Sequence, residues 1–318
     1  MTQKELDYYV QGVTSQNRLV MAKTITLVES TLPAHQETAR AVMDALLPHT
    51  GKAVRLGITG VPGAGKSTFI ESFGMMLTEK GLRVAVLAVD PSSPRTGGSI
   101  LADKTRMEKL SVNEQAFIRP SPSGGTLGGV ARKTRETMMI CEAAGYDVIM
   151  VETVGVGQSE VAVASMVDFF LVLMIAGAGD ELQGIKKGVL ELADAITVNK
   201  ADGDNVERAK LARQQYETAM HLLSPPSPDW STPVLMCSSL AGSGLEDIWE
   251  TVLKHRKIMN DKGDLEKKRS EQSRLWMWAL VKEGLEEWFS KNAQVVNLLP
   301  LIEKEVVSGK ITATSGAA

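Results

Sequence analysis

Short apolar runs alternate with helical stretches along the middle of this chain. The runs are almost continuously apolar, and seven can be counted, at residues 54–59, 83–89, 115–119, 147–151, 169–174, 195–198 and 233–237. Strands with this pattern are covered on both faces, as in a parallel sheet. The pattern therefore predicts an α/β fold with a doubly wound, mostly parallel sheet. Ligands of such sheets bind at the carboxyl ends of the strands.

Helical patterns precede and follow this region. In residues 1–50, apolar side chains recur at helical spacing, at Leu19, Ala22, Ile25 and Val28 and again at Ala41, Val42, Ala45 and Leu46. From about residue 256 the chain is dense in charge, and three of its five tryptophans then follow, at Trp276, Trp278 and Trp288. Such a helix has to pack against its own domain or against a second subunit, and spacing alone favours neither. The small, polar tail, residues 312–318, is expected to fray.

One loop matches a phosphate-binding motif at every fixed position. Gly60 to Ser67 fits G-x-x-x-x-G-K-[ST], directly after the first apolar run and before a helical stretch, which is the context the motif requires. Lys66 is expected to reach the β- and γ-phosphates and to act in catalysis, and Ser67 to ligate Mg²⁺. A glycine-rich turn without a ligand is the weaker interpretation. The residues expected to cradle the nucleotide are Gly60, Val61, Pro62, Gly63, Ala64, Gly65, Lys66, Ser67 and Thr68.

Two further loops indicate guanine as the base. Asn199-Lys200-Ala201-Asp202 follows the sixth run and fits the N-K-x-D element of GTPases, in which a carboxylate accepts hydrogen bonds from N1–H and N2–H of guanine. Adenine offers no such pair of donors. Ser238, Ser239 and Leu240 follow the next run, where GTPases carry a loop whose backbone N–H contacts guanine O6. The predicted substrate and product are GTP and GDP.

Carboxylates are expected around the metal ion. Glu152 follows the fourth run directly and can hold Mg²⁺, and Gly155 can present its N–H to the γ-phosphate while allowing the loop to move. Asp90 and Asp103 could approach the same ion from a loop rich in proline and glycine. The predicted metal ligands are therefore Ser67, Asp90, Asp103 and Glu152. No residue matches with certainty the glutamine that orients water in other GTPases.

A glycine-rich, charged loop follows the fifth run. It spans residues 176–188 and carries Asp180, Gln183 and Lys186. We interpret it as a mobile switch that couples the nucleotide to a partner, with a solvated surface loop as the alternative. Lys66, Glu152, Gly155 and Lys186 form the predicted catalytic set.

Composition excludes several classes of function. The net charge is −3 and the pI about 5.9, so no basic surface indicates nucleic acid as a partner. The two cysteines are far apart and form no C-x-x-C pair. No apolar run of membrane-spanning length and no signal sequence is recognisable, so we expect a cytoplasmic protein without a membrane partner.

The motifs together resemble one family. The order G-V-P-G-A-G-K-S-T, V-D-P-S-S-P, V-E-T-V-G-V-G-Q-S-E, G-D-E-L-Q-G-I-K-K-G and N-K-A-D is similar to that of the MeaB/ArgK/MMAA G-protein chaperones of adenosylcobalamin-dependent acyl-CoA mutases. The likeness covers about residues 15–255 and weakens beyond them. It implies a P-loop GTPase domain with N- and C-terminal helical extensions, divided as 1–50, 51–255 and 256–318.

The resemblance also carries expectations about partners. It implies a homodimer that forms through an arm, residues 256–318. It also implies that this GTPase docks on a B12-dependent mutase and gates cofactor loading. The family's Mg²⁺ carboxylates match Asp90, Asp103 and Glu152, and its extra switch matches the loop with Lys186. Methylmalonyl-CoA mutase is the commonest client in the family. The alternatives are a kinase that phosphorylates a transport protein and a metal-insertion GTPase, which would need a cluster of Cys and His ligands, and no such cluster is recognisable in this sequence.

Overall fold

The computed structural model describes residues 1–89, 107–120, 127–153, 159–177, 187–221 and 229–318. Several residues of the predicted site lie outside these ranges, namely Asp90, Asp103, Gly155, Asp180, Gln183 and Lys186. The chain divides into two compact units, Met1–Leu265 and Glu266–Ala318. The predicted division at residues 50 and 255 stays a prediction.

A parallel sheet forms the centre of the first unit. Its seven strands have the order β3-β2-β4-β1-β5-β6-β7, and all pairs between neighbours are parallel. The strands are β1 (Val54–Gly60), β2 (Val84–Val89), β3 (Ala116–Arg119), β4 (Val148–Thr153), β5 (Phe169–Ile175), β6 (Ala195–Asn199) and β7 (Val234–Met236). The predicted parallel α/β sheet is confirmed, and each of the seven runs is a strand.

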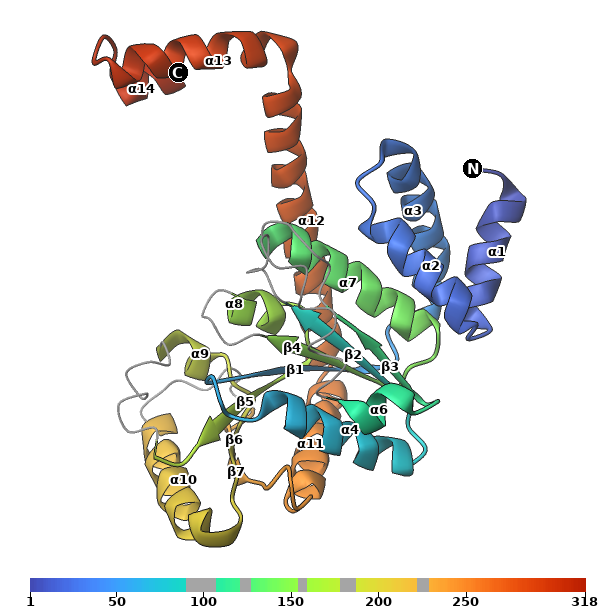
Figure 1. Ribbon diagram of the computed structural model, residues 1–318, viewed down its shortest axis with the longest axis vertical. Coiled ribbons are helices and arrows are strands. Elements are labelled where there is room, and N and C mark those ends of the chain that lie inside the picture. The colour runs from blue at the N-terminus through green and yellow to red at the C-terminus, as the bar shows by residue number, and fades with distance from the viewer. Residues whose placement is uncertain (90–106, 121–126, 154–158, 178–186, 222–228) are drawn as a thin grey trace. The chain divides into compact units, whose positions relative to one another are not determined.

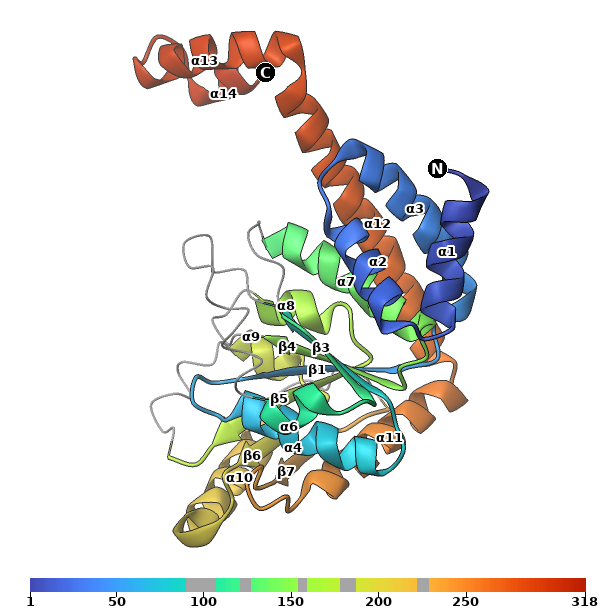
Figure 2. The same ribbon diagram turned by 45° about the vertical axis from the view of Figure 1, so that its right-hand side comes forward.

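Helices cover both faces of the sheet, so the fold is doubly wound (Figures 1 and 2). One face carries α4, α6 and α11, and the other carries α7 and α8, while α10 packs on β6 and β7. The bounds are α4 (Lys66–Glu79), α6 (Glu108–Val112), α7 (Leu127–Ala143), α8 (Ser159–Ala164), α9 (Lys187–Glu191), α10 (Val206–Met220) and α11 (Leu245–Asp261), with short 3₁₀ turns at Leu47–His49 and Gly203–Asn205. The central strands are buried on both sides, which explains their near-continuous apolar pattern.

Three helices precede the sheet, as predicted. They are α1 (Gln3–Thr14), α2 (Arg18–Glu29) and α3 (Pro33–Leu46), and α2 and α3 pack against α7. The apolar spacing predicted the α2 helix correctly, but two of the four apolar positions face solvent, since Leu19 is 65% exposed and Ala22 is also exposed. Met21 and Thr24 are buried together with Ile25 and Val28 instead. The burial of a threonine made this face hard to recognise from apolar spacing alone.

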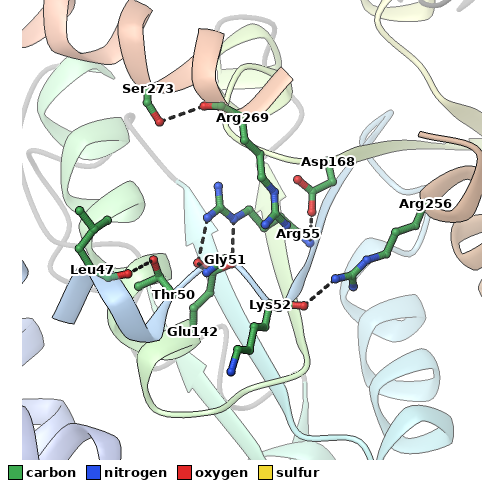
Figure 3. Close-up of polar contacts among 10 residues, drawn as sticks. All are labelled: Leu47, Thr50, Gly51, Lys52, Arg55, Glu142, Asp168, Arg256, Arg269 and Ser273. Atoms are coloured by element: carbon green, nitrogen blue, oxygen red, sulfur yellow. Dashed lines mark hydrogen bonds and ion pairs between the residues drawn. The ribbon is translucent and has the colours of Figure 1, made fainter. Parts of the chain in front are cut away.

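A buried ion pair lies at the amino end of the central strand β1 (Figure 3). The Arg55 guanidinium donates from Nε and Nη2 to the two carboxylate oxygens of Glu142 on α7, at 2.9 and 2.8 Å. Glu142 also accepts from the Gly51 N–H at 3.0 Å, and Asp168 accepts from the Arg55 N–H at 3.0 Å. These charged bonds fasten the start of β1 to α7 and to the turn before β5.

The second unit is helical. Helix α12 (Asp264–Lys291) leads into it, and α13 (Ala293–Val307) and α14 (Ala313–Ala317) follow. The expectation that residues 312–318 fray was wrong, because Thr312 caps α14 and Gly316 packs so closely that a Cβ there would lie 2.7 Å from Val306. Large apolar side chains of this unit stay exposed, among them Trp278, Trp288 and Phe289. Within the described residues, no helix is long and apolar enough to span a bilayer.

Candidate nucleotide-binding site

Glycines shape the loop between β1 and α4. A Cβ at Gly60 would lie 2.3 Å from the Leu173 carbonyl oxygen of neighbouring β5, so only glycine permits this strand spacing. Gly63 and Gly65 have φ of 80° and 83°, in the left-handed region, and Gly65 is the N-cap of α4. The loop therefore turns sharply into a helix N-terminus, where free N–H groups and the helix dipole favour an anion.

The Lys66 side chain folds back over this loop. Its Nζ donates to the Gly60 carbonyl at 2.8 Å and lies 3.4 Å from that of Val61. Burial lowers the pKa of Lys66, while the charges of Glu152 and Glu160 partly oppose this shift. Among the described residues, the half-buried Lys66 ammonium bonds to backbone carbonyls and interacts with two carboxylates. Such a group is suited to meet a phosphate without a large rearrangement.

Glu152 lies beside the start of α4. The Ser67 hydroxyl donates to Glu152 Oε1 at 3.4 Å, so a hydroxyl and a carboxylate converge at the carboxyl end of the sheet. We expected the fourth strand to end at residue 151, but β4 continues through Thr153, because Glu152 still pairs with both β1 and β2 and Thr153 pairs with Val89 of β2. Thr153 then donates from its buried hydroxyl to that of Thr59 at 2.7 Å, which joins the ends of β4 and β1.

The Asn199 side chain connects the three predicted loops. Its Nδ2 donates to the Ala64 carbonyl in the P-loop at 2.8 Å. Its Oδ1 accepts from the Ser239 N–H at 3.1 Å, from the Ser239 hydroxyl at 2.8 Å and from the Cys237 thiol at 3.3 Å. Asn199 is 1% exposed, so its side-chain amide cannot bond to water. The bonds within the protein take the place of those hydrogen bonds to water.

Asp202 faces the same loop. Its carboxylate accepts a short hydrogen bond from the Ser238 hydroxyl, and the Ala201 N–H donates to the Cys237 carbonyl at 3.0 Å. Lys200 has a φ of 59°, an uncommon left-handed conformation for a lysine, which lets the chain turn between Asn199 and Asp202. The carboxylate is thereby held at the carboxyl end of the sheet beside the predicted guanine loop.

The structure thus brings together the described part of the predicted site. The P-loop, Glu152, Asn199, Asp202 and the stretch 238–240 share the carboxyl end of the sheet. Leu240 differs from the others because its side chain is 84% exposed. Asp90, Asp103, Gly155 and Lys186 lie outside the described residues. In the described part of the chain, no group of three or more His, Cys, Asp or Glu side chains could hold a metal ion.

Sequence reasoning missed four residues that contact this site. Glu160 is buried near enough to Lys66 to affect its pKa, and Cys237 bonds to Asn199. Thr153 joins two strand ends, and the Ser72 hydroxyl on α4 donates to the Ser239 carbonyl at 2.6 Å. Glu160 and Thr153 stand within the motif that contains Glu152, which was an available signal. Nothing in the sequence around Ser72 marks its partner, 167 residues away.

Comparisons with known proteins agree with this geometry. A family model described as "Methylmalonyl Co-A mutase-associated GTPase MeaB" matches residues 21–294. A Caulobacter vibrioides protein named "Putative GTPase" is 55% identical over 313 residues, which are 98% of this chain and 96% of that protein. The mouse "Methylmalonic aciduria type A homolog, mitochondrial" is 45% identical, over 98% of this chain and 77% of its own length.

A solved structure is similar along the whole chain. It is described as "LAO/AO transport system kinase", has a TM-score of 0.80 and 39% sequence identity, and is matched over 100% of this chain and 96% of its own. These matches confirm the family resemblance and the fold expected from the sequence.

Proposed function

Because the chain belongs to the MeaB family of methylmalonyl-CoA mutase-associated GTPases, we propose that it is a chaperone of an adenosylcobalamin-dependent acyl-CoA mutase. The chain is a GTPase and hydrolyses GTP to GDP and phosphate. In the proposal, the nucleotide state gates loading of the cofactor into the mutase and protects the loaded enzyme. The client is methylmalonyl-CoA mutase or a related acyl-CoA mutase.

One observation carries the assignment of the nucleotide site, namely the bond between Asn199 and Ala64. This hydrogen bond connects the loop after β1 with the loop after β6, which supports a single site for phosphate and base. In the proposal, the backbone from Gly60 to Thr68 cradles the phosphates, and Lys66 neutralises the charge that develops on the transferred group. Asn199, Lys200 and Asp202, with Ser238, Ser239 and Leu240, hold the guanine base.

The residues near Ser67 fit a magnesium ion. A hydroxyl and a carboxylate are hard oxygen ligands of the kind that Mg²⁺ prefers, and those of Ser67 and Glu152 lie 3.4 Å apart. Asp90 and Asp103 complete the proposed ligand set. When bound, the ion would neutralise charge on the β- and γ-phosphates. The chain's own contribution is to hold Ser67 at the start of α4 and Glu152 on β4, so that both face the phosphate loop.

The exposed apolar side chains of residues 266–318 support a homodimer. Trp278, Trp288 and Phe289 are each more than half exposed. Isolated large apolar residues are common on protein surfaces, but several aromatic side chains on one short unit are typical of an interface. We propose that a second copy of this chain covers them. The molar mass in solution, measured by light scattering, tests this, and a monomer at all concentrations would contradict it.

The decisive experiment measures GTP hydrolysis with and without a purified methylmalonyl-CoA mutase. A chaperone is expected to hydrolyse GTP slowly alone and faster on its client, because the client completes the catalytic arrangement. Lys66→Ala is expected to hydrolyse GTP very slowly both with and without the mutase. Lys186→Ala is expected to keep the slow rate of the chain alone and to lose mainly its stimulation by the mutase. Equal rates with and without every acyl-CoA mutase tested would contradict the chaperone role but would leave the GTPase intact.

The similar solved structure described as a transport system kinase supports one alternative, a protein kinase. A kinase needs a base beside an acceptor hydroxyl. Labelled γ-phosphate tests whether the chain also acts as a kinase, since hydrolysis transfers the label to water and a kinase transfers it to a protein. Labelled transport protein after incubation would favour the alternative.

A further inference from the structure

The Ser72 hydroxyl makes an unusual bond for a serine inside a helix. A helical serine ordinarily points to water or bonds to a carbonyl one turn back in its own helix. Ser72 instead donates to the Ser239 carbonyl at 2.6 Å, from α4 to the stretch after β7. The side chain is half-buried, so water competes only in part for the bond.

This bond completes the fixation of Ser239. Its N–H and its hydroxyl both donate to Asn199 Oδ1, at 3.1 and 2.8 Å, and its carbonyl accepts from Ser72. Every polar group of Ser239 is therefore held by the protein. Asn199 holds one side of the residue and Ser72 holds the other.

The bond from Ser72 to the Ser239 carbonyl also orients the backbone N–H of the next residue, Leu240. The peptide between Ser239 and Leu240 is planar and trans, so its N–H points opposite to the carbonyl that Ser72 holds. Ser72 thereby directs the Leu240 N–H away from α4. Within the ranges that the structure describes, the Leu240 N–H has no hydrogen-bond acceptor, whereas the Ser239 N–H is already bonded to Asn199.

We propose that Ser72 is a positioning residue for guanine recognition, which orients the Leu240 N–H to donate to guanine O6. The inference rests on the proposed guanine site and deepens it. Lys66 and Ser72 lie six residues apart on the same helix, about 9 Å along its axis. In this proposal, one helix sets the phosphate site with its first residue and the base site with a residue fewer than two turns later.

The test compares two nucleotides with the wild type and Ser72→Ala. GDP carries the carbonyl oxygen at position 6, and 6-thio-GDP carries a sulfur, which is a poorer acceptor, while N1–H and N2–H are unchanged. We expect Ser72→Ala to weaken GDP binding about three- to tenfold, the range that one net hydrogen bond contributes. The variant should weaken 6-thio-GDP binding much less, so the preference for GDP should shrink.

Three controls separate this effect from others. Ser72→Thr keeps the hydroxyl and should keep the wild-type preference for GDP over 6-thio-GDP. Ser111→Ala removes a hydroxyl that donates to the Glu108 carbonyl within α6, and it should change the affinity for neither nucleotide. Asp202→Asn tests the guanine site itself. If Asp202→Asn leaves the GDP affinity unchanged, the proposed guanine site fails. A different result would be that Asp202→Asn weakens GDP binding while Ser72→Ala weakens the binding of both nucleotides equally, or of neither. That result overturns only the role of Ser72.

Discussion

The Asn199 Nδ2 donates to the carbonyl oxygen of Ala64 at 2.8 Å, across 135 residues of sequence. Asn199 ends β6, and Ala64 lies inside the phosphate loop after β1. The two strands are not neighbours, since β5 lies between them. A single side chain therefore spans the width of a strand to connect two loops that the sequence motifs treat as separate.

Replacing Asn199 should cost stability and nucleotide affinity together. Asn199→Ala leaves the Ala64 carbonyl and the Ser239 N–H without this partner, and an unsatisfied buried group costs about 1–3 kcal/mol. We expect the free energy of unfolding to fall by about 2–4 kcal/mol in urea denaturation, with weaker GDP binding. Asn260→Ala, at an exposed position of α11, is the matched control and should change the stability by less than about 0.5 kcal/mol. An equal, small effect of both variants would contradict the connecting role.

Guanine specificity should depend on the Asp202 carboxylate. Asp202→Asn replaces one acceptor oxygen by a donor, so the variant should bind GDP and GTP more weakly and accept xanthine nucleotides, whose C2 carbonyl would face the new amide. Asp204→Asn makes the same change two residues away, in the adjacent 3₁₀ turn, and should keep the wild-type preference. Fluorescence titration measures the affinity of each variant for GDP and for XDP. An Asp202→Asn variant that prefers GDP as strongly as the wild type would remove this assignment.

The ionisation of Lys66 should respond to Glu152. Burial lowers the pKa of Lys66, and the Glu152 carboxylate opposes this, so Glu152→Gln should lower that pKa further. An NMR titration of labelled lysine in the nucleotide-free protein measures the shift. A Lys66 pKa that is unchanged or higher in Glu152→Gln would show that the two groups do not interact.

The same shift has a consequence for stability. Because the pKa of Lys66 is lower in the folded chain, the unfolded chain binds more protons between the folded and the unfolded value. The free energy of unfolding therefore rises with pH across that alkaline window. Lys66→Met should lack this rise, and its denaturation midpoints should change less with pH than those of the wild type.

The ion pair between Arg55 and Glu142 should stabilise the fold without affecting the chemistry. Arg55→Met leaves the carboxylate of Glu142, whose side chain is 0% exposed, without its cation, and breaking such a pair costs about 3–5 kcal/mol. The double variant Arg55→Met, Glu142→Leu should lose less of the free energy of unfolding than Arg55→Met, because no unpaired charge stays buried. GTP hydrolysis by folded protein should stay near the wild-type rate in both. A double variant less stable than Arg55→Met would contradict this account.

The sequence predicted the fold well because its signals were local. Near-continuous apolar runs marked all seven strands, and the glycines of the phosphate loop stand where left-handed φ angles or close strand packing require them. Strand ends were less accurate. Glu152 and Thr153 belong to β4 although they are polar, because pairing with a strand on each side decides where a central strand ends.

The contacts that connect the loops could not be predicted. The bonds of Ser72 to Ser239 and of Asn199 to Ala64 join residues far apart in sequence, and neither pair has a local pattern. The buried face of α2 does not follow the apolar spacing for a related reason, since Leu19 is exposed and Thr24 is buried. Tertiary packing decided these positions, and a single sequence contains no signal of it.

The hydroxyl pair of Thr59 and Thr153 makes the ends of β1 and β4 observable in solution. Both side chains are at most 1% exposed, and the Thr153 hydroxyl donates to that of Thr59 at 2.7 Å. Because this hydroxyl proton is shielded from water, we expect it to exchange slowly and to give its own NMR resonance. Its exchange rate would report whether the two strand ends separate during turnover, without any label near the nucleotide. The chain thus contains an intrinsic spectroscopic probe between its phosphate loop and the strand of Glu152.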